Sequence, residues 1–223
     1  MKPNRKQPPE KPELPAKSTV PIVPLHLSTL DDERICQHAS LINSELSKIA
    51  AKFVILRACE ASNVDFAASE LPKLSLSDTL IASCDLSNVD MAECSGHRVL
   101  IENCRMIGFR STDANWEDLT VKNCQMAYAS FGETTFKRAI FEECDLTDAD
   151  FIHANLEAVT FLNCTLARTR FSEAKCKGMD LRGSELEEII IGPRELQGVI
   201  IEPAQAAVLI SHLGVKVKWP DQK

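Results

Sequence analysis

Large apolar residues recur at every fifth position along most of the chain. In the stretch FEECDLTDADFIHANLEAVTFLNC they are Phe141, Leu146, Phe151, Leu156 and Phe161. A helix repeats its buried positions every three or four residues and a half-buried strand every second residue, so neither element explains this period. The frame holds 33 positions from Leu41 to Ile201, and 28 of them are Leu, Ile, Val, Met, Phe or Trp.

A second inward position precedes each large residue by two. From Ala39 to Val199 this position is small or apolar, and Arg194 is its only charged residue. The residue between the two inward positions is often polar, as at Asp145 and Asn155. Each repeat therefore predicts a three-residue strand followed by a two-residue corner, and the unbroken frame predicts a solenoid of stacked coils.

Five cysteines give the number of sides of the coil. They occupy the small inward position of every fourth repeat, at Cys84, Cys104, Cys124, Cys144 and Cys164. A feature that returns after four repeats marks one full turn, so the coil is four-sided. Stacked strands lie about 4.8 Å apart, so the 33 repeats predict about eight coils and a rod on the order of 40 Å long.

Two irregularities are explained by this register. Gly96 stacks one coil below Trp116, where a missing side chain leaves room for an oversized one. Phe109 is large at a small position, and Ser111 is small at the large position that follows it.

The chain ends differ from the repeats. Residues 1–19 are expected to be a disordered basic arm, since the segment 1–17 holds five Lys or Arg, two Glu and five Pro. Residues 20–38 are expected to cap the solenoid, with VPIVPLHL as an edge strand and a short helix that starts at Ser28 or Thr29. A longer helix from Ile35 to Phe53 is the alternative, but the five-residue frame continues unshifted from Ala39 and is favoured.

The repeats resemble those of the pentapeptide-repeat proteins, whose motif is A-(D/N)-L-x-x. The segments ADFIHANLEAVTF and CDLTDADF carry this motif closely. The resemblance covers residues 39–203 and implies an all-β, right-handed quadrilateral β-helix. The C-terminal segment LQGVIIEPAQAAVLISHLGVKV is similar to the end of the quinolone-resistance subfamily. That resemblance implies imitation of DNA towards DNA gyrase, a type II topoisomerase, and a dimer formed by the C-terminal helix.

Residues 204–223 are expected to form a C-terminal helix that caps the last coil, dimerises, or does both. Pro203 suits the first turn of a helix and Gly214 suits its end. The residues expected on one face of the helix are Ala206, Leu209, Ile210 and Leu213.

Composition narrows the class of protein. The 223 residues are 44% hydrophobic with a formal net charge of −7, which argues against direct binding to nucleic acid. No apolar run approaches the roughly 20 residues of a membrane span, and the N-terminus lacks the apolar centre of a signal peptide. The nine cysteines include no CxxC pair, so they are interpreted as reduced thiols in a cytoplasmic protein.

No residues form a recognisable catalytic or cofactor-binding motif. The histidines are scattered, with His97 and His153 expected at corners, and no phosphate-binding loop or HExxH motif occurs. The cysteine ladder is interpreted as small apolar packing rather than a metal or redox site. We therefore expect no enzyme activity, no cofactor and no metal.

The functional hypothesis rests on columns of charged residues that are spaced 20 positions apart. Asp78, Arg98, Asp118 and Arg138 alternate in sign, as expected of a structural column. A corner column is nearly all acidic, and its members are Glu93, Asp113, Glu133, His153 and Glu173. It would bind a partner with a basic surface, or its side chains would simply extend into water.

A further outward column is largely apolar and comprises Leu80, Leu100, Thr120, Ile140 and Thr160. Three explanations stand at this point: the segment Val20–Leu27 covers it, a dimer partner covers it, or it is an exposed β-face.

Taken together, the sequence predicts a non-enzymatic protein-binding module that imitates DNA towards a type II topoisomerase. The alternative is a general scaffold or structural solenoid.

Overall fold

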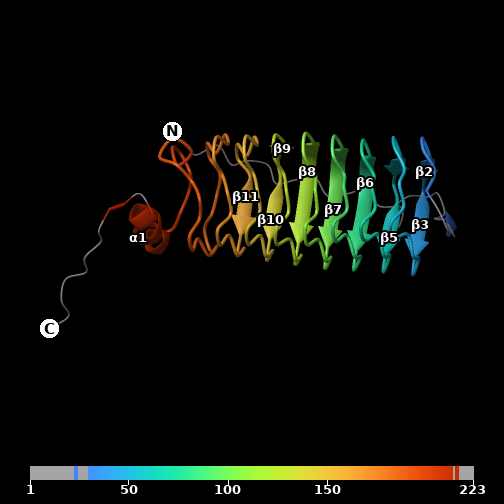
Figure 1. Ribbon diagram of the computed structural model, residues 1–223, viewed down its shortest axis with the longest axis horizontal. Helices are drawn as coiled ribbons and strands as arrows, with labels where there is room; N and C mark the ends of the chain where they lie inside the picture. Colours follow the sequence, from blue (N-terminus) through green and yellow to red (C-terminus); the bar gives the residue numbers. More distant parts are fainter. Residues whose placement is uncertain (1–22, 25–29, 213, 216–223) are drawn as a thin grey trace.

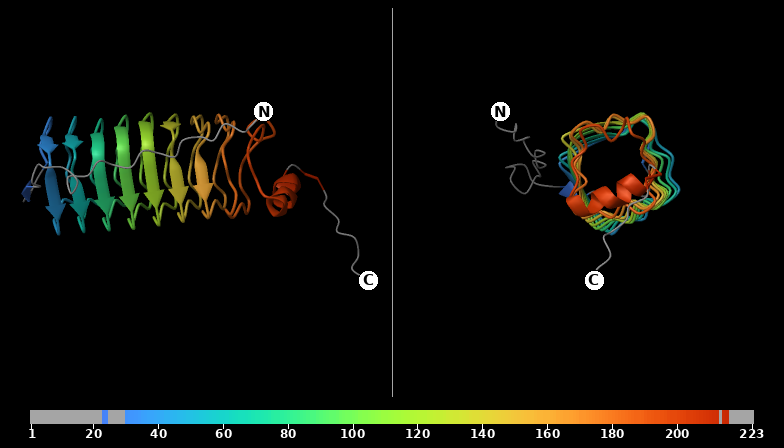
Figure 2. Two further views of the ribbon diagram at one scale, coloured as in Figure 1. Left: turned by 180° about the vertical axis from the view of Figure 1, so that it is seen from behind. Right: turned by 90° about the vertical axis from the view of Figure 1, so that its left-hand side faces the viewer.

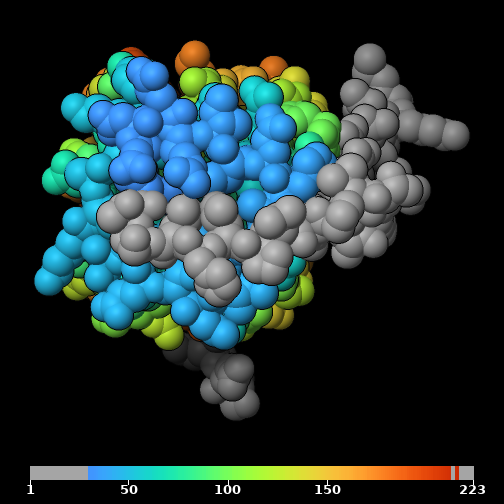
Figure 3. All heavy atoms as spheres, turned by 90° about the vertical axis from the view of Figure 1, so that its right-hand side faces the viewer, coloured from blue at the N-terminus to red at the C-terminus, as the bar shows by residue number. Residues whose placement is uncertain are grey.

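The computed structural model describes residues 23–24, 30–212 and 214–215. These residues form a straight rod of stacked coils that ends in one short helix (Figure 1). Seen along the axis, each coil is a four-sided loop, and the helix lies across the C-terminal end (Figure 2, right). From the opposite direction the first coils form the end of the rod (Figure 3).

One parallel sheet of 11 strands runs along the rod. The strands are β1 (Val23–Pro24), β2 (Ile35–Gln37), β3 (Ala39–Ile42), β4 (Ile55–Arg57), β5 (Glu60–Ser62), β6 (Ser75–Ala82), β7 (Ser95–Glu102), β8 (Asn115–Lys122), β9 (Thr135–Lys137), β10 (Ile140–Glu142) and β11 (Thr160–Leu162), and the helix is α1 (Pro203–His212).

From β2 onward, pairing always joins residues 20 positions apart. Leu76 pairs with Gly96, Gly96 with Trp116, and Trp116 with Phe136. On the other sides of the coil the same spacing appears as single bridges, and one such column consists of residues 45, 65, 85, 105, 125, 145, 165 and 185. These eight rungs confirm a four-sided β-solenoid in which four repeats complete each coil.

The corners explain why the repeat is five residues long. Every fifth residue from Glu33 to Glu188 has a positive φ, and the non-glycine residues at these corners lie between 48° and 69°. This left-handed conformation costs an L-residue roughly 1–2 kcal/mol. Hydrogen bonds offset the cost, since corner N–H groups donate to the next coil, as Asp113 does to the Gly132 carbonyl at 3.0 Å.

The core is a column of inward side chains. In the C-terminal half it consists largely of stacked rings, with ring centroids 5.0 Å apart for Phe131 and Phe151 and for Phe141 and Phe161. All five ladder cysteines are buried in this core.

The predicted packing of Trp116 over Gly96 is confirmed. A Cβ atom placed on Gly96 would lie 2.2 Å from Trp116 Cε3. The structure also explains why position 111 is a serine, which the sequence did not suggest. The buried Oγ of Ser111 accepts a 3.0 Å hydrogen bond from Trp116 Nε1. The small residue at a large position thus serves the indole ring of Trp116.

The N-terminal expectations are partly wrong. Residues 30–53 contain no helix, and β2 and the corner at Glu33 show that the coil starts before Ala39. In the segment Val20–Leu27 only β1 is described. It pairs with β3 through Val23–Ala39 and Pro24–Ser40 and adds a rung at the N-terminal end. These two residues therefore do not lie over the outward apolar column, and the rest of the segment, with Ser28 and Thr29, lies outside the described residues.

The coil is interrupted shortly before residue 203, although Ile200 still pairs with Asp180 on the preceding rung. Residues 193–198 form turns, and Arg194 is exposed. The cause is Pro193, which falls where each earlier repeat needs a positive φ, whereas the proline ring locks φ at a negative value. No helix in the described part of the chain is long and apolar enough to span a membrane.

Candidate protein-interaction surface

The acidic corner column consists of Glu93, Asp113, Glu133 and Glu173, with His153 on the fourth rung. All five side chains are exposed, and all five residues have the left-handed corner conformation. That conformation favours Gly, Asn and Asp, so the backbone itself gives no reason for Glu at three of these rungs. The side chains are aligned along one edge of the rod and extend into solvent.

Few side chains lie within ion-pair distance of this column. Lys73 Nζ lies 3.4 Å from Glu93, and His153 Nδ1 lies 3.6 Å from Glu173. Asp113 and Glu133 form no ion pair with any residue that the structure describes. The middle of the column therefore keeps its negative charge available to a partner.

Glu195 extends the column by one rung. Its Oε1 accepts a 3.0 Å hydrogen bond from the backbone N–H of Glu173. The sequence frame places Pro193 at this corner and so misses Glu195. Pro193 was the signal available in the sequence, because a proline cannot adopt the positive φ of this corner and therefore indicates that the five-residue frame breaks here.

The other charged columns are mostly neutralised by pairing between coils. Arg98 binds both carboxylate oxygens of Asp78 at 2.6 Å, and Arg138 binds both of Asp118 at 2.5 and 2.6 Å. Lys137 and Arg138 also bind Glu117, and their hydrogen bonds lower the pKa of that carboxyl below its usual range. The alternating columns therefore stabilise the sheet, in contrast to the acidic corner column.

The cysteine ladder shows the chemistry of a packed core. Cys104 Sγ lies 3.4 Å from the Cys84 backbone N–H, which donates to it, and 3.3 Å from the Glu102 carbonyl. All nine cysteines are free and buried. Outside the ladder, burial raises the pKa of the Cys94 and Cys176 thiols to about 12, so these two thiols are neutral at physiological pH.

Helix α1 closes the solenoid through a residue that the sequence did not single out. The buried Gln205 donates from Nε2 to the carbonyls of Leu181 and Ser184, both at 2.7 Å. Leu209 is buried beside it, Ala206 is half-buried and Ile210 is 41% exposed. Leu213 lies outside the described residues.

The outward apolar column is half-buried along its length, at Leu80, Leu100, Thr120, Ile140 and Thr160.

A second group of polar residues also went unnoticed in the sequence. His97, Glu117 and Asp118 have donor atoms that all lie within 4.8 Å of one another. We expected His97 at a corner, but it lies inside β7 and pairs with Glu117 on β8. The signal was available, because residues 20 positions apart are neighbours on adjacent coils.

Comparisons with known proteins agree with this architecture. The family model described as "Pentapeptide repeat region" matches residues 54–131 and 120–191. No protein with a curated description matches the chain.

Two solved structures are similar to the chain. A trypsin-treated form of QnrB1, a plasmid-mediated fluoroquinolone resistance protein, is 17% identical, with 89% of this chain and 98% of that chain covered and a TM-score of 0.43. The second is HetL from the cyanobacterium Nostoc sp. strain PCC 7120, a protein involved in heterocyst differentiation regulation. It is 17% identical, with 76% of this chain and 90% of that chain covered and a TM-score of 0.36. Because the family match spans more than half of the chain in the five-residue frame seen in the structure, the chain belongs to the pentapeptide-repeat family.

Proposed function

We propose that this chain is a non-catalytic binding protein that presents the acidic corner column to a basic surface on another protein. The observation that carries the proposal is the pair Asp113 and Glu133, exposed on successive rungs without a cation among the described residues. Like charges on neighbouring strands destabilise a sheet. A column retained against that cost is best explained by a partner that neutralises it.

The total charge of the rod supports the same proposal. Residues 30–202 contain 29 Asp and Glu against 17 Lys and Arg, a formal net charge of −12. Most of the basic residues are already bound to acids on adjacent coils. A basic partner would be drawn to the rod by long-range attraction, and its rate of association would fall as salt rises.

We further propose a type II topoisomerase such as DNA gyrase as the partner, with the column in place of DNA. The rungs are about 4.8 Å apart, whereas phosphates along one DNA strand rise about 3.4 Å each. The column therefore has the sign and regularity of a phosphate strand at a lower charge density. A cytoplasmic location, where thiols stay reduced, belongs to the same proposal.

The test neutralises the column without changing its shape. The variant carries Glu93→Gln, Asp113→Asn, Glu133→Gln and Glu173→Gln. The matched control carries Gln at four exposed acids outside the column, namely Glu45, Glu143, Glu157 and Glu187. Both variants lose four negative charges, so only the position of the charges differs.

Gyrase supercoiling and DNA competition are measured with the native chain and both variants. We expect inhibition by the native chain that weakens with salt, a several-fold loss in the column variant and a smaller loss in the control. Equal losses would reject the column as the site. Absence of any effect of the native chain would reject the topoisomerase, and the general scaffold would then be the better description.

A further inference from the structure

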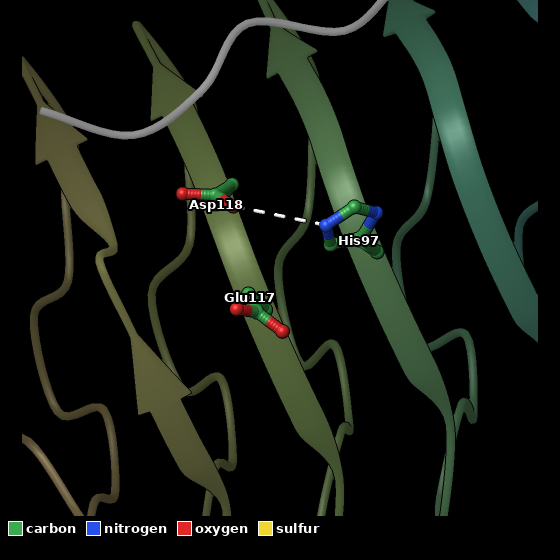
Figure 4. A group of neighbouring side chains, drawn as sticks. All are labelled: His97, Glu117 and Asp118. Atoms are coloured by element: carbon green, nitrogen blue, oxygen red, sulfur yellow. Dashed lines mark ion pairs between the residues drawn. The ribbon is translucent and has the colours of Figure 1, made fainter.

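We infer that His97, Glu117 and Asp118 form a binding site for a divalent transition-metal ion on the side of the rod. The three side chains come from β7 and β8 and lie beside one another on adjacent coils, with possible ligand atoms within 4.8 Å of one another (Figure 4). The site lies outside the acidic corner column and is independent of the function proposed above.

The separation between His97 and Asp118 suits a shared ion. His97 Nε2 lies 3.8 Å from Asp118 Oδ2, too far for a direct hydrogen bond. Two ligand atoms that each bind one zinc-like ion at about 2.1 Å lie at most about 4.2 Å apart. The observed separation falls below this limit, so small side-chain rotations bring both atoms into coordination.

The choice of ligands restricts the ion. One imidazole nitrogen and two carboxylates, without thiolate, suit Zn²⁺, Co²⁺, Mn²⁺ or Fe²⁺ better than Mg²⁺ or Ca²⁺, which prefer oxygen ligands alone. His97 and Glu117 also line an open cavity of about 380 Å³ together with Ser75, Ser95 and Thr135. This cavity leaves space for water or a partner's side chain as the fourth ligand.

The cations already at the site define its affinity. Arg138 binds both oxygens of the buried Asp118 and fixes the orientation of that carboxylate, as a supporting residue does in a metal site. Lys137 is 61% exposed and binds Glu117 from the surface. Because an exposed ion pair contributes little, a divalent ion can displace Lys137, and the site has modest affinity.

Lys137 competes with the metal ion for Glu117, and this competition distinguishes the proposed site from adventitious binding to a surface histidine. Co²⁺ and Zn²⁺ are titrated into the native full-length chain by calorimetry and absorption, above the ordinary histidine pKa of about 6.5. We expect a single equivalent of Co²⁺ bound at this site with a spectrum of nitrogen and oxygen ligands. His97→Asn should weaken binding at least about tenfold, and Glu117→Gln should weaken it as well.

The decisive comparison is between two lysine variants. Lys137→Met removes the more exposed of the two cations that bind Glu117, the other being Arg138, and should tighten binding several-fold. Lys175→Met removes an exposed lysine from the same side of the coil, two rungs beyond Thr135, and should leave affinity unchanged. Equal effects of the two lysine variants, unchanged affinity in His97→Asn, or a thiolate absorption band would each overturn the assignment.

Discussion

At the residue scale, one missing side chain controls the middle of the rod. A Cβ atom on Gly96 would lie 2.2 and 2.3 Å from two atoms of the Trp116 ring, and that ring is buried and hydrogen-bonded to Ser111. The ring therefore cannot move aside without losing its hydrogen bond. Even the smallest side chain at position 96 overpacks the core.

We expect Gly96→Ala to reduce the free energy of unfolding by about 1–3 kcal/mol. Gly132→Ala is the matched control, because a Cβ atom there has its nearest contact at 3.6 Å, from the Ile152 carbonyl oxygen. That variant should be neutral or slightly stabilising. Urea unfolding measures both, and equal stability of the two variants would contradict the packing of Trp116 over Gly96.

At the element scale, the cap depends on a single amide. Gln205 Nε2 donates to two carbonyls of the last coil, and Gln205 Oε1 accepts from the Glu202 N–H at 2.8 Å. Replacement by Leu keeps the size but leaves these groups without their partner. An unsatisfied buried polar group costs about 1–3 kcal/mol.

Gln205→Leu should therefore destabilise α1 and the coil it covers, seen as a lower melting temperature and faster amide exchange near Leu181. Ile210→Ala changes an exposed residue of the same helix and should leave both quantities nearly unchanged. Should Ile210→Ala instead reduce the apparent mass in solution, α1 would also form a dimer contact. Unaltered exchange near Leu181 in Gln205→Leu would contradict the capping role.

The same elements show how far sequence reasoning reaches. The repeats were predictable because burial alternates with corners in a fixed frame, so Trp116 and the cysteine ladder were placed correctly. The ends were not, because they depend on single contacts. Pro193 breaks the five-residue frame, and the carboxylate of Glu195 lies at that corner instead. Gln205 binds backbone carbonyls of the last coil, and no sequence pattern indicates these contacts. The metal site required residues to be compared across coils rather than along the chain.

At the scale of the whole molecule, the rod is unevenly packed. Phenylalanine rings fill most of the large positions from Phe131 to Phe171, with Phe151 and Phe171 stacked at 5.4 Å. The N-terminal coils instead contain Ala51 and Ala61 at these positions, and a small apolar cavity of about 20 Å³ is bounded by Leu41, Leu56 and Ala61 among others. Each coil contacts only its neighbours, so stability is expected to vary along the axis.

Native-state hydrogen exchange should reveal this gradient. Because poorly packed coils open at lower free energy, amides of β4 and β5 should exchange faster than those of β10 and β11. Ala61→Val adds two methyl groups towards the cavity and should slow exchange in β4 and β5, with a gain of about 1 kcal/mol. The C-terminal coils should be unaffected, since the change lies several rungs away. Uniform exchange along the native rod would mean that it opens as one cooperative unit, and the packing difference would then have no consequence for its dynamics.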